Sequence, residues 1–583
     1  RKVRCDRRQP CSHCSRGGLI CSFPVSGRMP SRRYDPSSPN LQNKAELLGR
    51  LRHLEGIISE LSSQLQEEDG SRTATNSSAR ATTDQMGAGN TNTANMPKFV
   101  RQLDHLVIHN NQSLYIRNTL WTAICDEVKH IQKSLDGQYY NKNGSNGCIA
   151  PRLDSSTERA PFFWGHEIRG NQNLQPLPSQ VPFIWLVFLE NVDPFIKVLH
   201  VPTMSESIKE SKGRFGSMTP SMEALMFAIS LAAVNSLSDE EITETFNDGK
   251  GRLLSRLTLG TEQALSRTGV LHTTDIRVVQ AFTIYLHTVE QCDGPRAIWT
   301  LAGLLLRTAL SMGLHRDSAH FANISPFEAE MRRRLWWSIC FLDARVGDCQ
   351  VFESGISPGL FDTRDPINLD DADLQPDMSK LPPAKDGFTN ATYCIMQCEM
   401  WRYTRRMRMS MAAHPDAGGR RERRRMLEEV RERLIRTFYK HIGGNDPLHV
   451  YIQTMDSVSV SAWGLVEYVD RIPTVTQKKR DEIFLTAVAS LHYVAQLQTQ
   501  PITRKWAWTL RDNVQWHAMT ALLSQLHKHA WGPMCELGWR LVQRAIAEVG
   551  AEAHAQNHPM RSALLELAGS VAHHRAAELR RLG

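Results

Sequence analysis

The sequence has no long apolar run, because none of its hydrophobic stretches reaches the roughly 18 residues of a membrane-spanning helix. Residues 224–234 are too short, and the apolar segment 298–314 is interrupted by Arg307. We therefore expect no membrane span and no membrane partner. The sequence also lacks the glycine-rich nucleotide loops, the His-Glu-x-x-His metalloprotease motif and the Gly-x-Ser-x-Gly esterase motif. These absences argue against an enzyme.

Cysteine is scarce, with 12 in 583 residues, which is too few for a secreted disulfide scaffold. We therefore expect an intracellular protein, in which clustered cysteines act as metal ligands. Four of them lie close together, at Cys5, Cys11, Cys14 and Cys21. The spacing of Cys11 and Cys14 allows two thiolates to bind one tetrahedral Zn²⁺. Two alternatives stay open: four incidental thiols in a basic tail, and a one-zinc site that also uses His13.

Positive charge is concentrated at the start of the chain. The formal net charge is +8, and residues 1–40 hold nine of the 69 Lys and Arg against two Asp. The rest of the chain is nearly neutral, which indicates a short basic segment that binds a polyanion. The candidate DNA-contacting residues surround the cysteines and are Arg1, Lys2, Arg4, Arg7, Arg8 and Arg16.

The run Arg1-Lys2-Val3-Arg4-Cys5 and the cysteine spacing after it resemble the fungal Zn₂Cys₆ binuclear cluster, a DNA-binding domain of transcription regulators. The resemblance implies that Cys5 is the third ligand, Cys11 the bridging fourth, and Cys14 and Cys21 the fifth and sixth. It also implies two Zn²⁺ per intact cluster, and it places Lys2 at the base-reading position in the major groove of double-stranded DNA. The first two cysteines of the pattern have no counterpart. We therefore expect residues 1–21 to be an N-terminally truncated, incomplete zinc-cluster domain, called the zinc head below. Its own cysteine thiolates complete the four-ligand set of neither zinc ion.

A linker and a dimerisation segment are predicted next. Residues 22–40 are rich in proline, serine and glycine, as is typical of an extended linker. Residues 41–68 predict a short parallel coiled coil, in which Arg50 and Glu55 can pair across a homodimer. A helix packed on its own domain is the alternative. The apolar positions follow a heptad pattern and are Leu47, Leu51, Leu54, Ile58, Leu61 and Leu65. In Zn₂Cys₆ proteins such segments set the separation of two CGG-like half-sites.

The rest of the chain is predicted to be mainly α-helical. Residues 69–98 hold almost no large apolar residue and are expected to be disordered. Residues 99–180 are predicted as a helical and loop connector, with helical character over 99–135. Residues 181–411 and the C-terminal region 412–583 have helical apolar spacing. Long buried helices are predicted at residues 223–237, 276–289, 298–314 and 326–346, with Gly313 ending the third.

Several segments of residues 181–411 resemble the fungal-specific transcription factor domain, the large all-α regulatory domain found with Zn₂Cys₆ clusters. The most specific is the Arg-Arg-Arg-Leu-Trp-Trp run that ends at Trp337, followed by Asp343. The others are residues 188–194, 199–202 and 299–317, then Gly355, Pro366, Asn368 and Asp370. Helical bundles rich in Met and Trp can hold a small-molecule effector, so such a partner is kept as a candidate.

The polar residues of this body have structural interpretations. The arginines before the two tryptophans are expected to pair with core carboxylates, and His200, His287 and His315 to be packed or capping histidines. Cys394 and Cys398 are expected to be small core residues. Residues 402–436 carry twelve Arg and five acids, which predicts a solvated helix with many salt bridges, or alternatively a nuclear import patch.

Together these patterns predict a zinc-dependent, sequence-specific DNA-binding transcription regulator of RNA polymerase II genes. It is expected in the nucleus as a homodimer, and the family resemblance implies control of a metabolic or secondary-metabolite gene set. The alternative is a helical sensor or dimerisation partner without DNA binding, because two zinc ligands are missing from the expected pattern.

Overall fold

The structure is a computed structural model of the 583-residue chain. It describes residues 105–109, 112–116, 174–289, 295–321, 323–350, 355–357, 359–414, 417–441, 446–466, 475–510, 515–527, 529–551 and 559–582. All of them belong to the second of two units into which the chain divides, Ala94–Gly583. The predicted zinc head (1–21), linker (22–40), coiled coil (41–68) and disordered segment (69–98) lie outside the described residues.

A two-stranded antiparallel hairpin lies in the predicted connector. Strand β1 is His105–His109 and strand β2 is Gln112–Ile116, with Val107 opposite Leu114. The prediction of helical character for residues 99–135 is wrong for these two segments. Both are rich in β-branched and aromatic residues, and two asparagines, a common turn residue, separate them in the sequence. Among the described residues these are the only strands.

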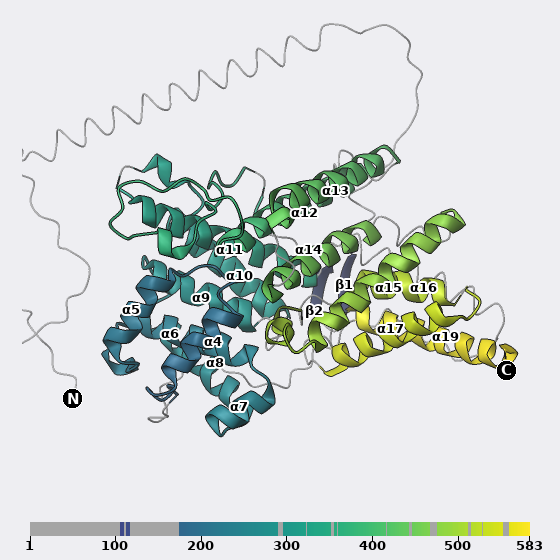
Figure 1. Cartoon of the computed structure of the whole chain (residues 1–583), viewed down its shortest axis with the longest axis horizontal. Helices are drawn as coiled ribbons and strands as arrows, with labels where there is room; N and C mark the ends of the chain where they lie inside the picture. Colours follow the sequence, from purple (N-terminus) through teal and green to yellow (C-terminus); the bar gives the residue numbers. More distant parts are fainter. Residues whose placement is uncertain are drawn as a thin grey trace, which may run out of the picture. The chain divides into compact units, whose positions relative to one another are not determined.

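The fold is mainly α-helical, as predicted, and four of its helices match predicted ones (Figure 1). They are α6 (Pro220–Ser236), α9 (Ile276–Val289), α10 (Pro295–Ser311) and α11 (Pro326–Gln350). The other α-helices are α4 (Val181–Asn191), α5 (Val201–Ser211), α7 (Asp239–Phe246), α8 (Lys250–Arg267), α12 (Thr392–Ala413), α13 (Ala417–Thr437), α14 (Pro447–Val466), α15 (Gln477–Thr499), α16 (Trp516–Leu526), α17 (Pro533–Ala551) and α19 (Pro559–Leu582). Short 3-10 helices are η2 (Phe215–Ser217), η3 (Ser318–His320), η4 (Asp371–Asp373), η5 (Tyr439–His441) and η7 (Arg504–Leu510).

Local sequence signals set several helix ends. Helix α7 begins with a capping box, in which the Ser238 hydroxyl accepts from the Glu241 amide and the Glu241 carboxylate accepts from the Ser238 amide. Helix α10 is followed by Gly313 at a φ of 70°. The amide of Gly313 donates to Leu310 and that of Leu314 donates to Ala309. This is a Schellman motif, so the predicted stop at Gly313 is confirmed.

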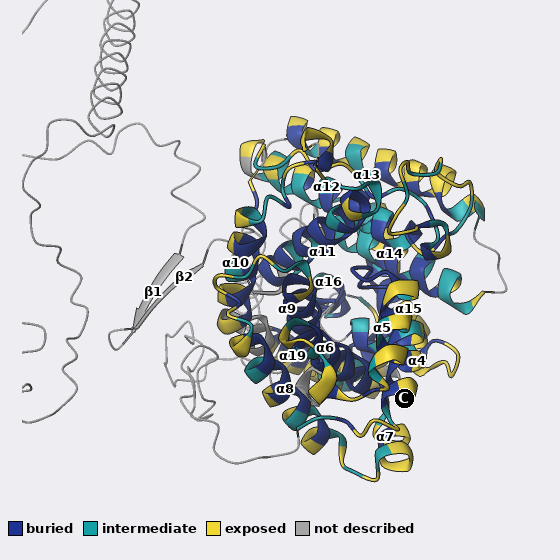
Figure 2. Ribbon diagram, turned by 90° about the vertical axis from the view of Figure 1, so that its left-hand side faces the viewer, coloured by how far each residue is buried: buried dark blue, intermediate teal, exposed yellow. Residues whose placement is uncertain are grey.

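The helices enclose two apolar cores. In the first, α6 packs against α4, α8 and α9, while α11 packs against α9, α10 and α12. This core extends from Val181 to Leu510 and includes residues of α14 and η7. The second is formed mainly by α15, α16, α17 and α19, with residues from Leu465 to Val571. Figure 2 shows the buried residues on the sides of the helices that face one another. None of the described helices is long and apolar enough to cross a membrane.

Candidate functional site

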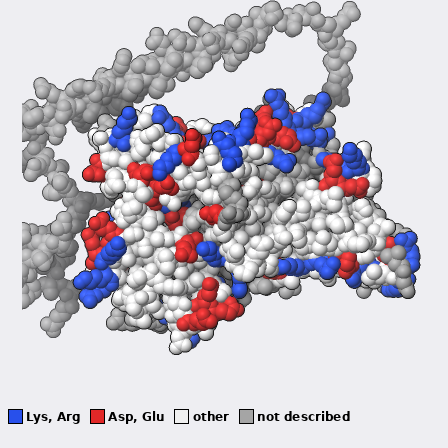
Figure 3. All heavy atoms as spheres, viewed as in Figure 1, with Lys and Arg blue, Asp and Glu red and all other residues white. Residues whose placement is uncertain are grey.

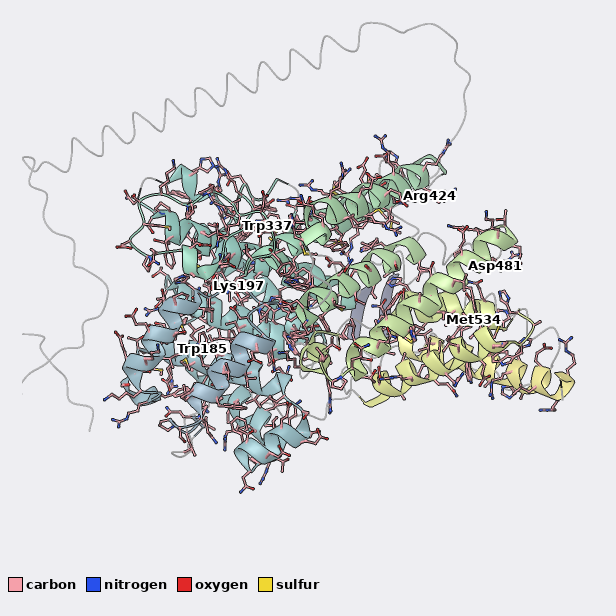
Figure 4. The ribbon with its side chains drawn as sticks, in the orientation of Figure 1. Trp185, Lys197, Trp337, Arg424, Asp481 and Met534 are labelled. Atoms are coloured by element: carbon pink, nitrogen blue, oxygen red, sulfur yellow. The ribbon has the colours of Figure 1, made fainter. Side chains whose placement is uncertain are left out.

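The zinc, DNA-contacting and dimerisation residues predicted from the sequence all lie outside the described residues. The strongest feature of the described part is a buried network of charges around the Arg-Arg-Arg-Leu-Trp-Trp segment of α11. It joins α11 to the loop after α4 and to η4, through Asp371. Figure 4 labels one of its members, Lys197 in the loop after α4, and Trp337 of the α11 segment.

The three consecutive arginines of α11 point in different directions, because successive residues of a helix are rotated by about 100°. Arg332 donates to the carbonyl of Met312 at 2.5 Å, just after α10. Arg333 makes a two-pronged ion pair with Asp317, at 2.9 and 3.0 Å.

The third arginine, Arg334, is completely buried. It donates to Glu330 at 3.1 Å and to Asp371 at 2.6 Å. Each arginine of the run therefore fixes a different neighbouring segment to α11.

Asp371 is the centre of the network. Lys197 donates to it at 2.7 Å, and the backbone amide of Val201 donates at 3.0 Å. Burial would raise the pKa of Asp371, but the charges of Lys197 and Arg334 outweigh it and hold this pKa at about 2. Asp371 is therefore ionised at neutral pH and holds both cations in the core.

Two further carboxyls complete the network. Lys197 also donates to Asp193 at 2.5 Å, and Glu330 receives Arg334. Burial raises the pKa of both acids, against the opposing effect of the nearby cations. Lys197 and Arg334 thus face three carboxyls in the core, those of Asp193, Glu330 and Asp371.

The tryptophans of the same segment fix the loop before η4. The Trp337 indole donates to the carbonyl of Arg364 at 2.9 Å. Its ring packs edge-on against Phe361 and Trp401 at centroid distances of 5.4 and 5.6 Å. The Arg402 guanidinium lies 4.7 Å from the ring centroid of Trp337. The predicted pairing with core carboxylates is confirmed for Arg333 and Arg334, whereas Arg332 donates to a backbone carbonyl. Trp336 and Trp337 are both buried, at 0% and 2% exposed.

The Pro-x-Asn-x-Asp segment holds the loop after Trp337 in place. The Asn368 amide donates to the carbonyls of Lys385 and Gly387 at 2.8 and 2.9 Å, and its oxygen accepts from Thr389 at 2.8 Å. Asp370 accepts from the Asn390 amide at 3.0 Å. These residues brace a loop.

The histidines that the sequence singled out have structural roles. His200 precedes α5 and is buried, with Nδ1 2.7 Å from the Thr203 hydroxyl and Nε2 2.9 Å from the Asp371 carbonyl. His287 is buried against Ser338, 3.2 Å away, and burial lowers its pKa well below the usual value. His315 lies beside Trp336, with ring centroids 6.2 Å apart. These contacts confirm the structural interpretation.

The two cysteines of α12 are also core residues. Cys394 and Cys398 are free and buried, and the Cys398 thiol donates to the Cys394 carbonyl at 3.1 Å. Burial raises the pKa of the Cys398 thiol well above its ordinary value. In the part of the chain that the structure describes, no group of His, Cys, Asp or Glu could hold a metal ion. The described network can therefore fix loops and helices, and it holds no arrangement for metal chemistry.

Sequence reasoning did not identify the Lys197–Asp371 pair. The segments 188–194 and 199–202 flank Lys197, and Asp370 precedes Asp371, but the pair itself joins positions far apart in the sequence. A Lys within an apolar segment, between Ile196 and Val198, was the available signal. A buried lysine needs a partner, although the sequence does not say which carboxylate supplies it.

Comparison with known proteins gives two family matches. Residues 1–29 match the fungal Zn(2)-Cys(6) binuclear cluster domain, and residues 185–347 match the fungal specific transcription factor domain. The second match includes α11 and its arginines and tryptophans. The first includes the four clustered cysteines of the basic segment.

Three relatives illustrate the similarity. The aurofusarin cluster transcription factor of Gibberella zeae is 26% identical over 557 residues, which are 93% of this chain and 74% of that protein. The pyriculol/pyriculariol biosynthesis cluster transcription factor 1 of Pyricularia oryzae is 26% identical over 459 residues, or 76% of this chain and 61% of that protein. The C6 finger domain transcription factor hasF of Aspergillus fumigatus is 30% identical over 437 residues, or 67% and 56%.

The chain thus spans less than two thirds of the length of two of these three relatives. All three are named as transcription factors and none as an enzyme. The two family matches occur in the order that the sequence predicts, the zinc cluster first and the helical domain after it. On this evidence the chain belongs to the fungal Zn(2)-Cys(6) transcription factor family.

Proposed function

We propose that the protein is a zinc-dependent, sequence-specific regulator of RNA polymerase II genes that binds DNA as a homodimer. One observation carries the proposal: the basic four-cysteine segment lies within the zinc-cluster match and precedes the matched helical domain. The buried network of α11 supports a regulatory domain whose loops are held in one arrangement.

The metal ligands in this proposal are Cys5, Cys11, Cys14 and Cys21. The donor set fits zinc, because thiolates bind Zn²⁺ in tetrahedral geometry. A segment of about 20 residues has too little apolar surface to fold alone, and zinc supplies on the order of 10 kcal/mol of folding free energy in such segments. When bound, the metal gives a rigid scaffold for the basic side chains and no catalysis.

In the DNA contact, base reading is assigned to Lys2, and phosphate contacts to Arg1, Arg4, Arg7, Arg8 and Arg16. A single head reads only a short triplet. The heptad positions from Leu47 to Leu65 are proposed to join two chains. Two CGG-like half-sites are then read together, at a spacing that the linker 22–40 and the coiled coil determine.

The nucleus is the proposed location, since the family acts on chromosomal DNA. Two relatives are named after the aurofusarin cluster and the pyriculol/pyriculariol biosynthesis cluster. We infer that this chain also controls a set of secondary-metabolite genes. A small-molecule effector of the helical domain stays a prediction.

Zinc binding and DNA preference test the proposal together. The full chain is purified, its zinc content is measured by elemental analysis, and its affinity is compared for duplexes with paired CGG triplets and with scrambled triplets. We expect bound zinc and a preference for the CGG duplex, lost on chelation and restored by added zinc. The variant Cys11→Ser/Cys14→Ser should lose both properties.

The matched control is Cys394→Ala/Cys398→Ala, which removes two cysteines from the buried face of α12. This variant should bind as much zinc as the wild type and keep the preference for the CGG duplex. A wild-type chain that binds no zinc, or that binds both duplexes equally with zinc present, contradicts the proposal. It favours the alternative, a helical sensor or dimerisation partner without DNA binding, which the two missing cysteines of the zinc-cluster pattern predict.

A further inference from the structure

The first half of α13 carries an unusual concentration of arginine. Among its first nine residues, up to Arg425, there are five arginines and one glutamate, Glu422. Arg421, Arg424 and Arg425 are exposed and Arg420 is half-buried. Figure 3 shows Lys and Arg atoms gathered along α13, with a group of acidic atoms beside them, and Figure 4 labels Arg424 on this helix.

The arginines share one side of a fixed helix. Arg420 and Arg424 are one turn apart, as are Arg421 and Arg425, so the four project from the same broad face. The fifth, Arg423, lies on the opposite, buried face and is 4% exposed. It donates to the carbonyls of Ser410 and His414 at 3.2 and 2.7 Å, at the end of α12. This anchor fixes the face as a helical surface.

This placement of charge does not help the helix. The N-terminal end of a helix carries a partial positive charge, so a cation in the first turn, such as Arg420, costs about 0.3–1 kcal/mol. Like charges one turn apart add a further cost of a few tenths of a kcal/mol. In the second half of α13 the charges are mixed, and Arg436 has Glu432 one turn before it. Within its own helix the cluster is balanced at Arg425, which pairs with Glu429, and the first nine residues hold five arginines against one glutamate.

The start of α15 holds lysines and acids together, and Lys479 pairs there with Glu482 at 2.8 Å. The pKa of the exposed Glu482 is lowered, first by a hydrogen bond from Lys479 and also by the charges of Lys478 and Arg424. The side chains of α13 and α15 are therefore close enough to act on one carboxylate. Asp481 and Glu482 are the acids at this edge.

We propose that this surface, Arg420, Arg421, Arg424 and Arg425 of α13, contacts the phosphate backbone of duplex DNA without reading sequence. The planar guanidinium matches phosphate oxygens with two parallel hydrogen bonds, and it keeps its charge at all physiological pH values. A rigid row of arginines also suits the closely spaced charges of a duplex. The inference adds a second contact to the proposed DNA-binding function but does not depend on the zinc head.

The test compares two pairs of substitutions on the same helix in the full chain. Arg421→Gln/Arg425→Gln removes two charges from the proposed surface, and Arg431→Gln/Arg436→Gln removes two exposed charges from the second half of α13. Each pair breaks one exposed i,i+4 ion pair, Arg425–Glu429 or Glu432–Arg436. Glutamine keeps a high helix propensity, and thermal unfolding followed by circular dichroism checks that both variants fold.

The affinity for a labelled duplex of random sequence is measured over a series of salt concentrations, with zinc present and after chelation. We expect Arg421→Gln/Arg425→Gln to reduce the slope of log affinity against log salt by about 1.8, since each phosphate contact contributes about 0.9. The control pair should leave the slope unchanged. The difference should persist after chelation, because the surface acts without the metal.

Equal slopes for the two variants, or no binding of random duplex by the wild-type chain, overturn the proposal. Unchanged DNA binding with loss of binding to a purified nuclear import receptor also overturns it and assigns the surface to an acidic protein partner. A further outcome is that the wild type and both variants all bind CGG and scrambled duplexes equally while the two variants still differ in salt slope. In that case the proposed zinc-dependent reading of CGG triplets is wrong and this inference stands.

Discussion

Lys197 and Asp371 are 174 residues apart in the sequence and form a buried ion pair of 2.7 Å, with side chains only 1% and 4% exposed. Asp371 also receives Arg334 of α11, so one carboxylate holds two cations from separate segments. The desolvation of such charges is costly, and removing one partner leaves the others buried without compensation. The stability of this fold therefore depends on both members of the pair being present.

Replacing Asp371 with Asn should strongly destabilise the helical domain. The substitution leaves Lys197 and Arg334 with too few buried anions, and the expected loss is about 3–5 kcal/mol in the free energy of unfolding. Urea unfolding followed by circular dichroism measures it. Asp370→Asn is the matched control, because its ion pair with Lys385 is partly exposed and should contribute less than about 1 kcal/mol. Equal losses for the two variants would contradict this role of Asp371.

The packing of α8 on α6 gives a second prediction. A Cβ atom at Gly260 would lie 2.4 Å from the ring of Phe227, which is itself buried. Gly260→Ala should therefore destabilise the protein by about 1–3 kcal/mol through overpacking. Gly251, near the start of α8, has nothing within 4 Å of such an atom. Gly251→Ala should be neutral or stabilising by up to about 1 kcal/mol, and a lower melting temperature for this control than for Gly260→Ala would refute the argument.

Much of the fold was predictable because its signals are local. The helices α6, α9, α10 and α11 follow from apolar spacing, and Gly313 marks the stop of α10 from its residue type alone. The hairpin at His105–Ile116 was missed, since its apolar positions also fit a helix when read over a longer window.

The sequence predicts that the arginines of α11 pair with carboxylates, but it does not predict which carboxylates these are. The sequence showed that the arginines of α11 need carboxylates, and which ones they meet depends on long-range packing. Asp371 could not be chosen over Asp370 or Asp373 from the sequence, because one position along the loop decides which carboxylate turns inward. Arg423 is a similar case, since a solvated helix was expected there and this one arginine is buried.

The buried Asp456 of α14 should give the stability a pH dependence. Burial raises its pKa to about 7 from 3.8, and its carboxylate accepts a hydrogen bond of 3.5 Å from the Tyr439 hydroxyl. The folded state therefore keeps the proton over a range in which the unfolded chain has released it. The free energy of unfolding then falls as the pH rises from about 4 to about 7, and this contribution is constant above that range.

Asp456→Asn removes this titration while keeping a group that accepts from Tyr439. Relative to the wild type, the variant should gain about 2–3 kcal/mol between pH 5 and pH 8. Urea unfolding at the two pH values measures the gain. Asp481→Asn, at the exposed start of α15, should follow the wild type. A constant difference between Asp456→Asn and the wild type at both pH values would show that Asp456 does not titrate in this range.

The predicted coiled coil can be tested by placing charged side chains at its apolar heptad positions. Leu54→Asp/Leu61→Asp introduces two carboxylates at heptad positions that should face the partner chain, where they would be desolvated. Analytical ultracentrifugation of the full chain should then show a shift from dimer to monomer. Leu485 and Leu565 are exposed leucines of α15 and α19, so Leu485→Asp/Leu565→Asp is the matched control. A wild-type monomer, or an unchanged dimer in Leu54→Asp/Leu61→Asp, would contradict the predicted coiled-coil dimer.

Lys2 and Arg4 should differ in what they contribute to DNA binding, because one is assigned to a base and the other to a phosphate. Lys2→Ala should reduce the discrimination between CGG and scrambled duplexes by about 1–3 kcal/mol. Arg4→Ala should weaken binding to both duplexes alike and reduce the salt slope by about 0.9. Both variants are compared in chains loaded with zinc, so that loss of the metal is not mistaken for loss of a contact. If Lys2→Ala lowers the affinity for specific and scrambled duplexes equally, its place is at the phosphate backbone, and the base-reading role falls to another residue of the basic segment.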